Sequence, residues 1–448
     1  MESPFLPYIN LISHAVLSLS ITFIITTFNI PIILLQGLHT YIHPENVGAD
    51  PNQSNLRAAI RRPESSQENP EPKRRHRSKD KVEFDESNAQ IFRLRLVDAH
   101  LRSRLYFSNY QSVFVYSSVA LSNLFLRRFL PEEDSGIFST VPIALVVYVL
   151  CKVSVSLVKA AIERSASTKS EKQLSILLGV FGFLFVLLIV FIFAPSVLDF
   201  DFSSANGFAR TSIAIVAAGL VGSLYVPATR AARSFWLGTD QLQWNLAVIS
   251  CGTPARMLLY INYLMVVFTS LLWINPVAEI LVKKMVSDRE LGFGDKEKWV
   301  GNVGLVRSDF LKFRTWCLLG SAVLQLLSLR PNLQMYLNEA VLSWYQRLHT
   351  SKVPDLDFGR AKIFLHNYYL CLVVLQFFSA PALVLLFLSL SQIQGNLFGG
   401  FKSTDNYVHY SSLVKEVALF MAWWVVFIWA VFTSASLALY RYGILLIS

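Results

Sequence analysis

Charged residues are scarce in this chain. Asp, Glu, Lys and Arg make up only 16% of its 448 residues, whereas soluble domains carry about a quarter. Hydrophobic residues make up 53%, and Phe alone occurs 33 times. A soluble domain cannot bury so much apolar surface, and an intrinsically disordered chain would not carry it. The composition therefore excludes a soluble enzyme, a disulfide-rich secreted module and a disordered tail.

Cysteine and catalytic motifs are also missing or rare. The chain has four cysteines, far apart and without a CxxC pair, which excludes a zinc ribbon and a disulfide framework. No HExxH, GxSxG or GxxxxGK motif occurs, and neither His14 nor His366 has a second residue at metal-ligand spacing. We therefore expect no enzyme activity, no cofactor and no metal site.

Apolar stretches of about 20 residues recur along the chain, and this length crosses a bilayer core as a helix. The pattern predicts an all-α fold, a polytopic membrane helical bundle with about nine transmembrane helices. The predicted spans are 8–29, 105–126, 137–158, 174–196, 211–229, 257–281, 310–329, 363–390 and 417–440.

Three regions follow from these spans. Residues 1–29 hold the first span. Residues 30–104 are predicted to be a basic, largely disordered cytosolic loop, because 45–90 is rich in Pro, Ser, Glu and Arg. Within this loop, 91–96 alternates apolar and basic residues, which fits either a short strand or an interfacial segment. Residues 105–448 form the predicted eight-span membrane domain.

An amphipathic helix is predicted near 332–349, between the seventh and eighth spans. Its apolar residues recur every three or four positions, as expected for one face of a helix. The helix is expected to lie along the inner membrane surface or to dock under the bundle. The apolar positions are Leu333, Leu337, Val341, Trp344 and Leu348.

The net charge of +10 is better explained by loops that face anionic lipid than by nucleic acid, which we do not expect as a partner. Most Lys and Arg residues fall in loops on one side of the predicted spans. This bias predicts a lumenal or extracellular N-terminus and a cytosolic C-terminus, in an endomembrane or the plasma membrane. One basic run can bind anionic lipids or can simply be a solvated linker; it contains Lys73, Arg74, Arg75, Arg77, Lys79 and Lys81.

Short polar and aromatic motifs occur along the chain in a recognisable order. In order and spacing they resemble the transmembrane protein 161 family, most closely from about 225 to 381. The motifs are Tyr41-x-His43-Pro44, Pro227-x-x-Arg230-x-Ala232, Ile261-Asn262-Tyr263-Leu264 with Pro276, Arg330-x-x-Leu333-Gln334-x-Tyr336-Leu337-Asn338, Tyr368-Tyr369-Leu370-Cys371 with Gln376 and Pro381, and Trp423-Trp424.

This resemblance implies a multi-pass membrane protein, and animal members of the family are associated with control of ion currents in excitable cells. It draws attention to Arg230, Arg330 and Gln376 within the motifs. Gln325 stands where animal members carry Arg, so the resemblance implies no role here that needs a cation at that position.

Lys152 is the clearest ionisable residue inside a predicted span, where a charge costs roughly 2.5–3.5 kcal/mol on insertion scales. It can line a water-filled path, or it can reach the inner headgroups or pair with a neighbouring side chain. Glu279 is predicted at the opposite, outer end of the sixth span. There it is expected to pair with Arg314 or with Lys312, which enter the seventh span from outside.

Three prolines, Pro227, Pro276 and Pro381, are predicted to interrupt spans five, six and eight. Backbone carbonyls freed by such breaks can coordinate cations in transporters, but a simple kink satisfied by neighbouring helices is the more common outcome. The buried amides of Gln325 and Gln376 are expected to bridge helices.

Two functions remain open from the sequence. The first is a non-enzymatic membrane protein that regulates or scaffolds other membrane proteins, such as ion channels or transporters. It fits the resemblance and the lack of catalytic motifs. The alternative is a transporter or channel that uses Lys152 and the proline-broken spans five, six and eight.

Overall fold

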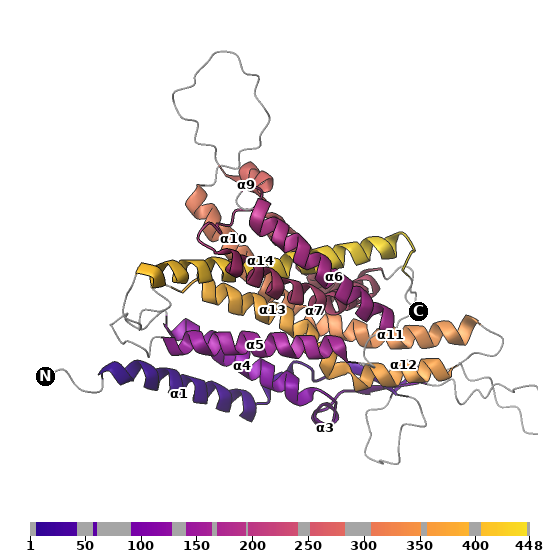
Figure 1. Cartoon of the computed structure of the whole chain (residues 1–448). Helices are drawn as coiled ribbons and strands as arrows, with labels where there is room; N and C mark the ends of the chain where they lie inside the picture. Colours follow the sequence, from indigo (N-terminus) through magenta and orange to yellow (C-terminus); the bar gives the residue numbers. More distant parts are fainter. Residues whose placement is uncertain are drawn as a thin grey trace, which may run out of the picture.

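The computed structural model describes residues 6–42, 57–60, 91–127, 140–163, 168–193, 196–240, 251–282, 306–350, 356–393 and 405–445. Long helices lie side by side in a bundle, with a small sheet at one end (Figure 1). The helices are α1 (Leu6–Thr27), α2 (Ile30–Ile33), α3 (Asp98–Arg102), α4 (Phe107–Arg127), α5 (Val141–Ile162), α6 (Lys169–Leu188) with the π-helical turn η4 (Ile189–Phe193), α7 (Gly207–Thr239), α8 (Thr253–Leu271), α9 (Asn275–Leu281), α10 (Arg307–Leu327), α11 (Leu329–Thr350), α12 (Asp357–Tyr368), α13 (Leu370–Ser391) and α14 (Asp405–Arg441).

The prediction of an all-α membrane bundle is confirmed. Within the described residues, eight helices are long and apolar enough to cross a bilayer: α1, α5, α6, α7, α8, α10, α13 and α14. The remaining predicted span, 105–126, corresponds to α4, which is less apolar and packs against α1, α5 and α13. Helix α1 begins at one end of the bundle and α14 ends at the other (Figure 1).

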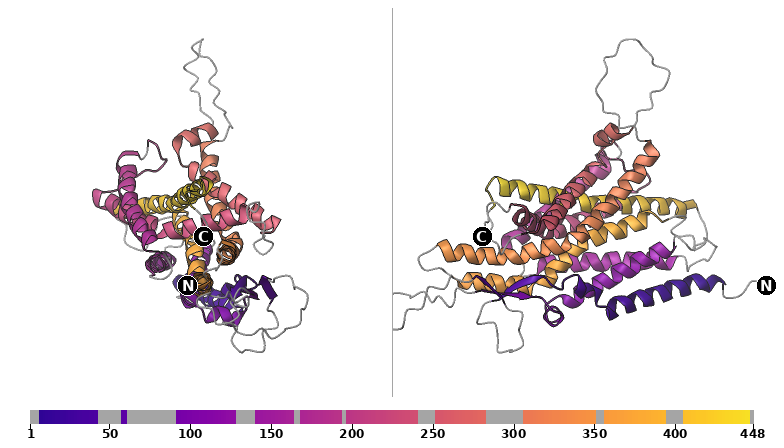
Figure 2. Two further views of the ribbon diagram at one scale, coloured as in Figure 1. Left: turned by 90° about the vertical axis from the view of Figure 1, so that its right-hand side faces the viewer. Right: turned by 180° about the vertical axis from the view of Figure 1, so that it is seen from behind.

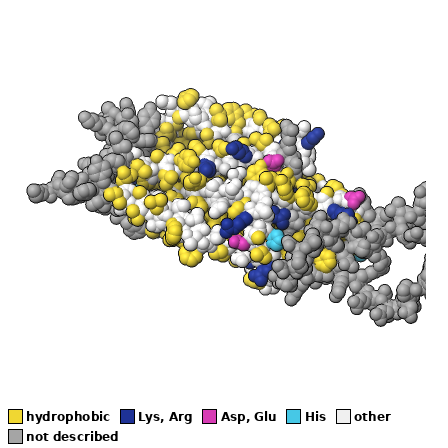
Figure 3. All heavy atoms as spheres, turned by 90° about the horizontal axis from the view of Figure 1, so that it is seen from below, with side chains coloured by type: hydrophobic (Ala, Val, Ile, Leu, Met, Phe, Trp, Pro, Cys, Tyr) yellow, Lys and Arg dark blue, Asp and Glu magenta, His cyan; other side chains and the backbone are white. Residues whose placement is uncertain are grey.

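The core of the bundle is α13. In its apolar window 89% of the residues are buried, whereas only 11% are buried in that of α1. Helices α4, α5, α7, α10 and α14 surround α13. Hydrophobic side chains cover much of the face seen from below, and single basic side chains are scattered over its middle and right-hand part (Figure 3). A buried helix inside and an apolar exterior outside are what a bilayer requires of a helical bundle.

Polar side chains fasten the most exposed helix, α1, to α4. The His14 Nδ1 atom lies 2.9 Å from Asn123 Oδ1, and Asn123 Nδ2 donates a hydrogen bond of 2.9 Å to Ser18 Oγ. His14 and Asn123 are both buried. Hydrogen bonds of this kind hold membrane helices together where lipid removes the hydrophobic driving force.

The three-stranded sheet is built from the region after the first span. Its strands are β1 (His39–Ile42), β2 (Arg57–Ile60) and β3 (Ile91–Arg95), in the order β1-β3-β2, and both pairings are antiparallel. The segment 91–96, for which two alternatives were open, is therefore a strand. The expectation of a largely disordered loop over 30–104 is corrected for α2, α3 and these strands; the basic run Lys73 to Lys81 and much of the rest lie outside the described residues.

Two predicted spans divide in the structure. The sixth span is α8 and α9, separated at 272–274, and Pro276 lies in the first turn of α9, where its missing N–H costs nothing. The eighth span begins within α12, and Tyr369 separates α12 from α13. By contrast, α7 and α13 continue through Pro227 and Pro381, which are buried. Of the two outcomes considered for these prolines, a divided helix and a helix accommodated by its neighbours, the structure shows the second at Pro227 and Pro381.

The predicted amphipathic helix is α11, and it is docked rather than spread on a surface. Buried side chains occur around several of its faces, including Leu333, Asn338, Glu339 and Trp344. Helices α11 and α12 pack side by side and extend beyond the end of the bundle, next to the sheet (Figures 1 and 2). Close packing at Gly359 brings α12 against the Trp344 ring.

Candidate functional site

A buried carboxylate, Glu339 on α11, lies where the α11–α12 pair meets the bundle. Its Oε1 atom is 3.0 Å from Arg233 Nη1 on α7 and 3.3 Å from Lys362 Nζ on α12. Its Oε2 atom is 4.0 Å from His366 Nε2, also on α12. Arg233 Nε in turn donates a hydrogen bond of 3.0 Å to Tyr440 Oη on α14. These five residues, here called the junction cluster, connect four helices.

The charges of the junction cluster favour an ionised Glu339, whose side chain is only 5% exposed. Burial by itself raises the pKa of this carboxyl, but Arg233, His366 and Lys362 outweigh burial and hold the pKa well below its ordinary value of 4.5. Burial lowers the pKa of Lys362, and Glu339 opposes that shift. A carboxylate surrounded in this way is a structural anchor rather than an acid or base poised to transfer a proton.

One turn earlier on α7, Arg230 makes a second link. Its Nη1 atom donates a hydrogen bond of 2.7 Å to Gln376 Oε1 on α13, and Gln376 Nε2 donates to the carbonyl of Ala160 on α5 at 3.4 Å. The structure thus brings together Arg230 and Gln376, two residues that the sequence motifs had marked separately. Gln376 is fully buried, and it bridges helices as expected for an intramembrane amide.

Side-chain amides from α11 and α12 occupy the free edge of β1. Gln334 Oε1 accepts from the His39 N–H at 2.9 Å, and Gln334 Nε2 donates to the His39 carbonyl at 3.1 Å. Asn367 Nδ2 donates to the Tyr41 carbonyl at 2.7 Å, and Tyr41 Oη donates to Asn338 Oδ1 at 3.0 Å. Unpaired strand edges invite association with other chains. Here the Gln334 and Asn367 side chains bind backbone groups of this edge, and these hydrogen bonds join the sheet to α11 and α12.

The outer face of α12 carries exposed aromatic and apolar side chains. Phe358 and Phe364 are 53% and 56% exposed, and Leu365 and Tyr368 are exposed as well. At 3.6 residues per turn, positions 358, 364, 365 and 368 fall on one side of the helix. These four residues are here called the α12 stripe. The sequence does not predict the α12 stripe, because the expected span begins at 363 and apolar side chains within a span face lipid.

At the other end of the bundle, Arg314 pairs with Asp199 rather than with Glu279. Arg314 Nη1 lies 2.7 Å from Asp199 Oδ2, and its guanidinium lies 4.0 Å from the centre of the Trp273 ring. The pairing of Glu279 with Arg314 predicted from the sequence is wrong. The Asn275 N–H donates to the Val197 carbonyl at 2.9 Å, and this contact folds the segment after η4 over the end of α8. Asp199 lies after the predicted span 174–196, so the sequence does not place it beside Arg314. Lys312 lies 4.0 Å from Asp309 instead.

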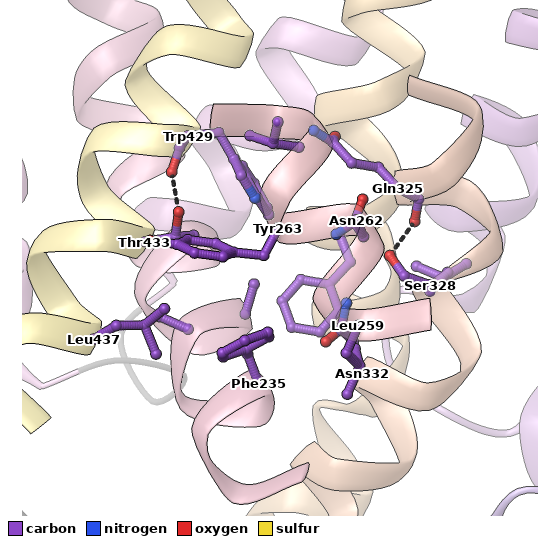
Figure 4. A pocket seen from close by; sticks show the side chains of 15 residues that line it. Phe235, Leu259, Asn262, Tyr263, Gln325, Ser328, Asn332, Trp429, Thr433 and Leu437 are labelled. Carbon is purple, nitrogen blue, oxygen red and sulfur yellow. Dashed lines mark hydrogen bonds between the residues drawn. The ribbon is translucent and has the colours of Figure 1, made fainter. Parts of the chain in front are cut away.

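A small crevice lies between α7, α8, α14 and the junction of α10 with α11 (Figure 4). Its cavity volume of about 30 Å³ has room for one or two water molecules. The Oδ1 atom of Asn262 and the Oε1 atom of Gln325 are buried there without a hydrogen-bond partner. Figure 4 shows Asn262 and Asn332 on one side of the crevice and Phe235 and Tyr263 on the other.

The remaining predicted site residues are spread over the fold. The Lys152 ammonium lies 4.3 Å from the centre of the Tyr116 ring on α4, and Lys152 is not among the residues that line the crevice. Arg330 Nη2 donates to the Gln36 carbonyl at 3.1 Å. Glu279 lies on the short helix α9. Within the described part of the chain, no group of His, Cys, Asp and Glu residues has the arrangement of a metal site.

Comparison with known proteins gives one family. Residues 208–405 match the model of a family described as predicted transmembrane protein 161AB. The match extends from α7 into the first turn of α14 and so includes Arg233, Glu339, Lys362 and His366 of the junction cluster. It confirms the resemblance seen in the sequence motifs. No solved structure matches the chain.

Proposed function

We propose that this chain, which the match over residues 208–405 assigns to the transmembrane protein 161 family, is a non-enzymatic regulator or scaffold of other membrane proteins. The proposed partners are ion channels or transporters. That the chain is a multi-pass membrane protein is established by the family and by its apolar helices; the regulatory role is the proposal.

The observation that carries the proposal is the α12 stripe. Helix α12 is not one of the candidate spans, and it lies in the part of the molecule that extends beyond the bundle (Figure 1). Apolar side chains that are exposed together outside a membrane commonly mark a protein-binding surface. Aromatic residues are enriched in the centres of such surfaces because they bury a large area at a low cost in side-chain entropy.

The contacts that hold α12 in place also favour protein binding at the α12 stripe. Lys362 and His366, on the same helix, contact the buried Glu339 carboxylate, and Asn367 is bound to β1. Helix α12 is therefore held by polar contacts on one side and presents the stripe on the other. A binding surface needs a rigid support of this kind, because immobilising a loose surface upon binding would cost affinity.

Photo-crosslinking tests this proposal. A photoreactive phenylalanine at position 364, in the full chain expressed in its own cells, should crosslink to a discrete membrane protein. The double substitution Phe358→Ala with Phe364→Ala should abolish co-purification of that protein. Tyr442 provides the control, because it is 79% exposed just past the end of α14 and should give no such product. Crosslinks to lipid alone at position 364 would contradict the proposal.

A transporter or channel is the second candidate, and the crevice with its unpaired Asn262 and Gln325 oxygens is what favours it. Its volume suits water rather than a solute, and Lys152 packs on Tyr116 away from it. Lys152→Cys, made together with Cys151→Ser because the neighbouring Cys151 is exposed, should resist charged thiol reagents from both sides. Rapid labelling, with solute flux in proteoliposomes of the purified protein, would favour transport instead.

A further inference from the structure

Three arginines converge where the first span passes into the sheet. Arg93 and Arg95 lie two residues apart on β3 and so point to the same face of the sheet. Arg330 approaches from the first turn of α11. A Cβ atom on Gly37 would lie 3.2 Å from an Nη2 atom of both Arg95 and Arg330, so these two guanidinium groups lie close together over the glycine. The four residues are here called the basic corner.

Gly37 is required at this position. Its φ angle of +84° is one that residues with a side chain rarely adopt, and the space above its Cα is taken by the two guanidinium groups. The absence of a side chain at Gly37 therefore lets both arginines occupy the same space. A substitution that added a Cβ would separate them.

Among the described residues, the basic corner has no compensating negative charge. In the described part of the chain no ion pair joins Arg93, Arg95 or Arg330 to a carboxylate, and the Nε atom of Arg93 is buried without a hydrogen-bond partner. The effect extends to His39, since burial and the positive charges of these three arginines lower its pKa. Guanidinium groups brought together without an anion repel one another, whereas phosphate can bridge them through paired hydrogen bonds.

The surroundings of the basic corner are those of a membrane surface. The corner follows directly after α1, which is a candidate span. Between α1 and Gly37 the chain exposes three large apolar side chains, Phe28, Ile33 and Leu34, of which Phe28 is 65% exposed. Arg95 and Arg330 are themselves exposed. An apolar surface next to a cluster of cations at the end of a span matches the two halves of an anionic lipid.

We propose that the basic corner binds the phosphate of an anionic phospholipid, in the leaflet where α1 ends, with the acyl chains against Phe28, Ile33 and Leu34. A lipid whose headgroup carries a phosphate monoester, such as a phosphoinositide, offers the most acceptor oxygens to the arginines. Because the basic corner connects α1, the sheet and α11, bound lipid would stabilise the position of the α11–α12 pair relative to the bundle.

Binding can be measured with the full-length protein in nanodiscs of phosphatidylcholine with or without phosphatidylinositol 4-phosphate. Lipid retained on the purified protein is counted by native mass spectrometry, and the melting temperature is recorded in parallel. The wild-type protein should retain the phosphoinositide and melt at a higher temperature in its presence. Arg95→Gln and Arg330→Gln should each weaken binding about fivefold, which corresponds to about 1 kcal/mol for each basic residue at a membrane surface.

Two controls separate this site from general charge and from folding. Arg441→Gln removes an exposed arginine at the end of α14 and should leave binding unchanged. Arg330→Lys keeps the charge and should retain most of the binding, which a purely structural role for the arginine would not predict. Equal loss with Arg441→Gln, or no loss with Arg95→Gln and Arg330→Gln, would overturn the proposal. So would equal stabilisation by inorganic phosphate or soluble inositol phosphate, because the ligand would then not be a lipid.

Discussion

At the residue scale, the Glu339 carboxylate holds three basic side chains together: Arg233, Lys362 and His366. Glu339→Gln should destabilise the protein by about 3–5 kcal/mol, because Arg233, Lys362 and His366 would be left around a neutral side chain. Unfolding of the detergent-solubilised protein by sodium dodecyl sulfate measures this change. Glu171→Gln is the control: it removes the half-buried capping carboxylate of α6 and should cost no more than about 1 kcal/mol.

The same carboxylate predicts a dependence on pH. The pKa of Glu339 is lower in the folded protein than its ordinary value of 4.5, so the unfolded chain takes up this proton first as the pH falls. The stabilisation from Glu339 is therefore fully present above about pH 4.5 and is lost progressively below it. Melting temperatures measured between neutral and acidic pH should fall at the acid end in the wild type and fall less steeply in Glu339→Gln.

Arg314 provides a second test at this scale. A double-mutant cycle of Arg314→Ala and Asp199→Ala should show a coupling free energy of about 1–3 kcal/mol, since the two groups are 2.7 Å apart and Arg314 is buried. The corresponding cycle of Arg314 with Glu279→Ala should show none. Coupling with Glu279 and none with Asp199 would mean that the segment after η4 does not fold over α8 as described.

Single residues also show how far the sequence predicts the site. Arg230, Gln376 and Arg330 were marked by motifs, and all three make specific contacts. Glu339 is not predicted as a site residue although it directly follows the motif residue Asn338, because it is not one of the apolar positions of the predicted amphipathic helix. Its burial depends on α7 and α12 covering it, and no local pattern on α11 reports this.

At the scale of helices, small residues decide how closely α6 and α7 approach. A Cβ atom on Gly182 would lie 2.8 Å from Val221 Cγ2, and the backbone near Gly179 approaches Gly222 closely. Gly182→Leu should therefore force the helices apart and cost about 1–3 kcal/mol, measured as a lower melting temperature. Gly207→Leu is the matched control on α7, because nothing lies within 4 Å of its added Cβ. An equal effect of both substitutions would contradict this account.

The helices also explain where the sequence misplaced boundaries. From hydropathy, residues 257–281 and 363–390 are each predicted as one span, because apolar residues continue through the breaks between α8 and α9 and between α12 and α13. The breaks at 272–274 and at Tyr369 come from contacts with other segments: Ile274 pairs with Leu198, and α12 packs on α11 and β1. An apolar run thus predicted that a segment is buried or lies in lipid, but it did not predict where the segment turns.

At the scale of the whole molecule, the arrangement of the helices predicts the topology. Helix α1 begins and α14 ends at opposite ends of the bundle (Figure 1), and the excess of Lys and Arg predicts that the C-terminal end is cytosolic. A fluorescent protein fused to the C-terminus should be digested by protease added to plasma-membrane-permeabilised cells. A tag at the N-terminus should be protected in internal membranes. Protection of both ends would require an even number of crossings and would exclude α4 as a span.

The sequence by itself determined the environment of this protein and the positions of its helices. Scarce charge and apolar runs of span length are local properties, and the need to satisfy backbone hydrogen bonds in lipid leaves helices as their only outcome here. The tertiary structure alone decided which polar groups meet. Arg233 and Glu339 are 106 residues apart, and Tyr41 and Asn338 are 297 apart. Such contacts depend on how each helix is rotated and where helices cross, and these are set by packing over the whole bundle.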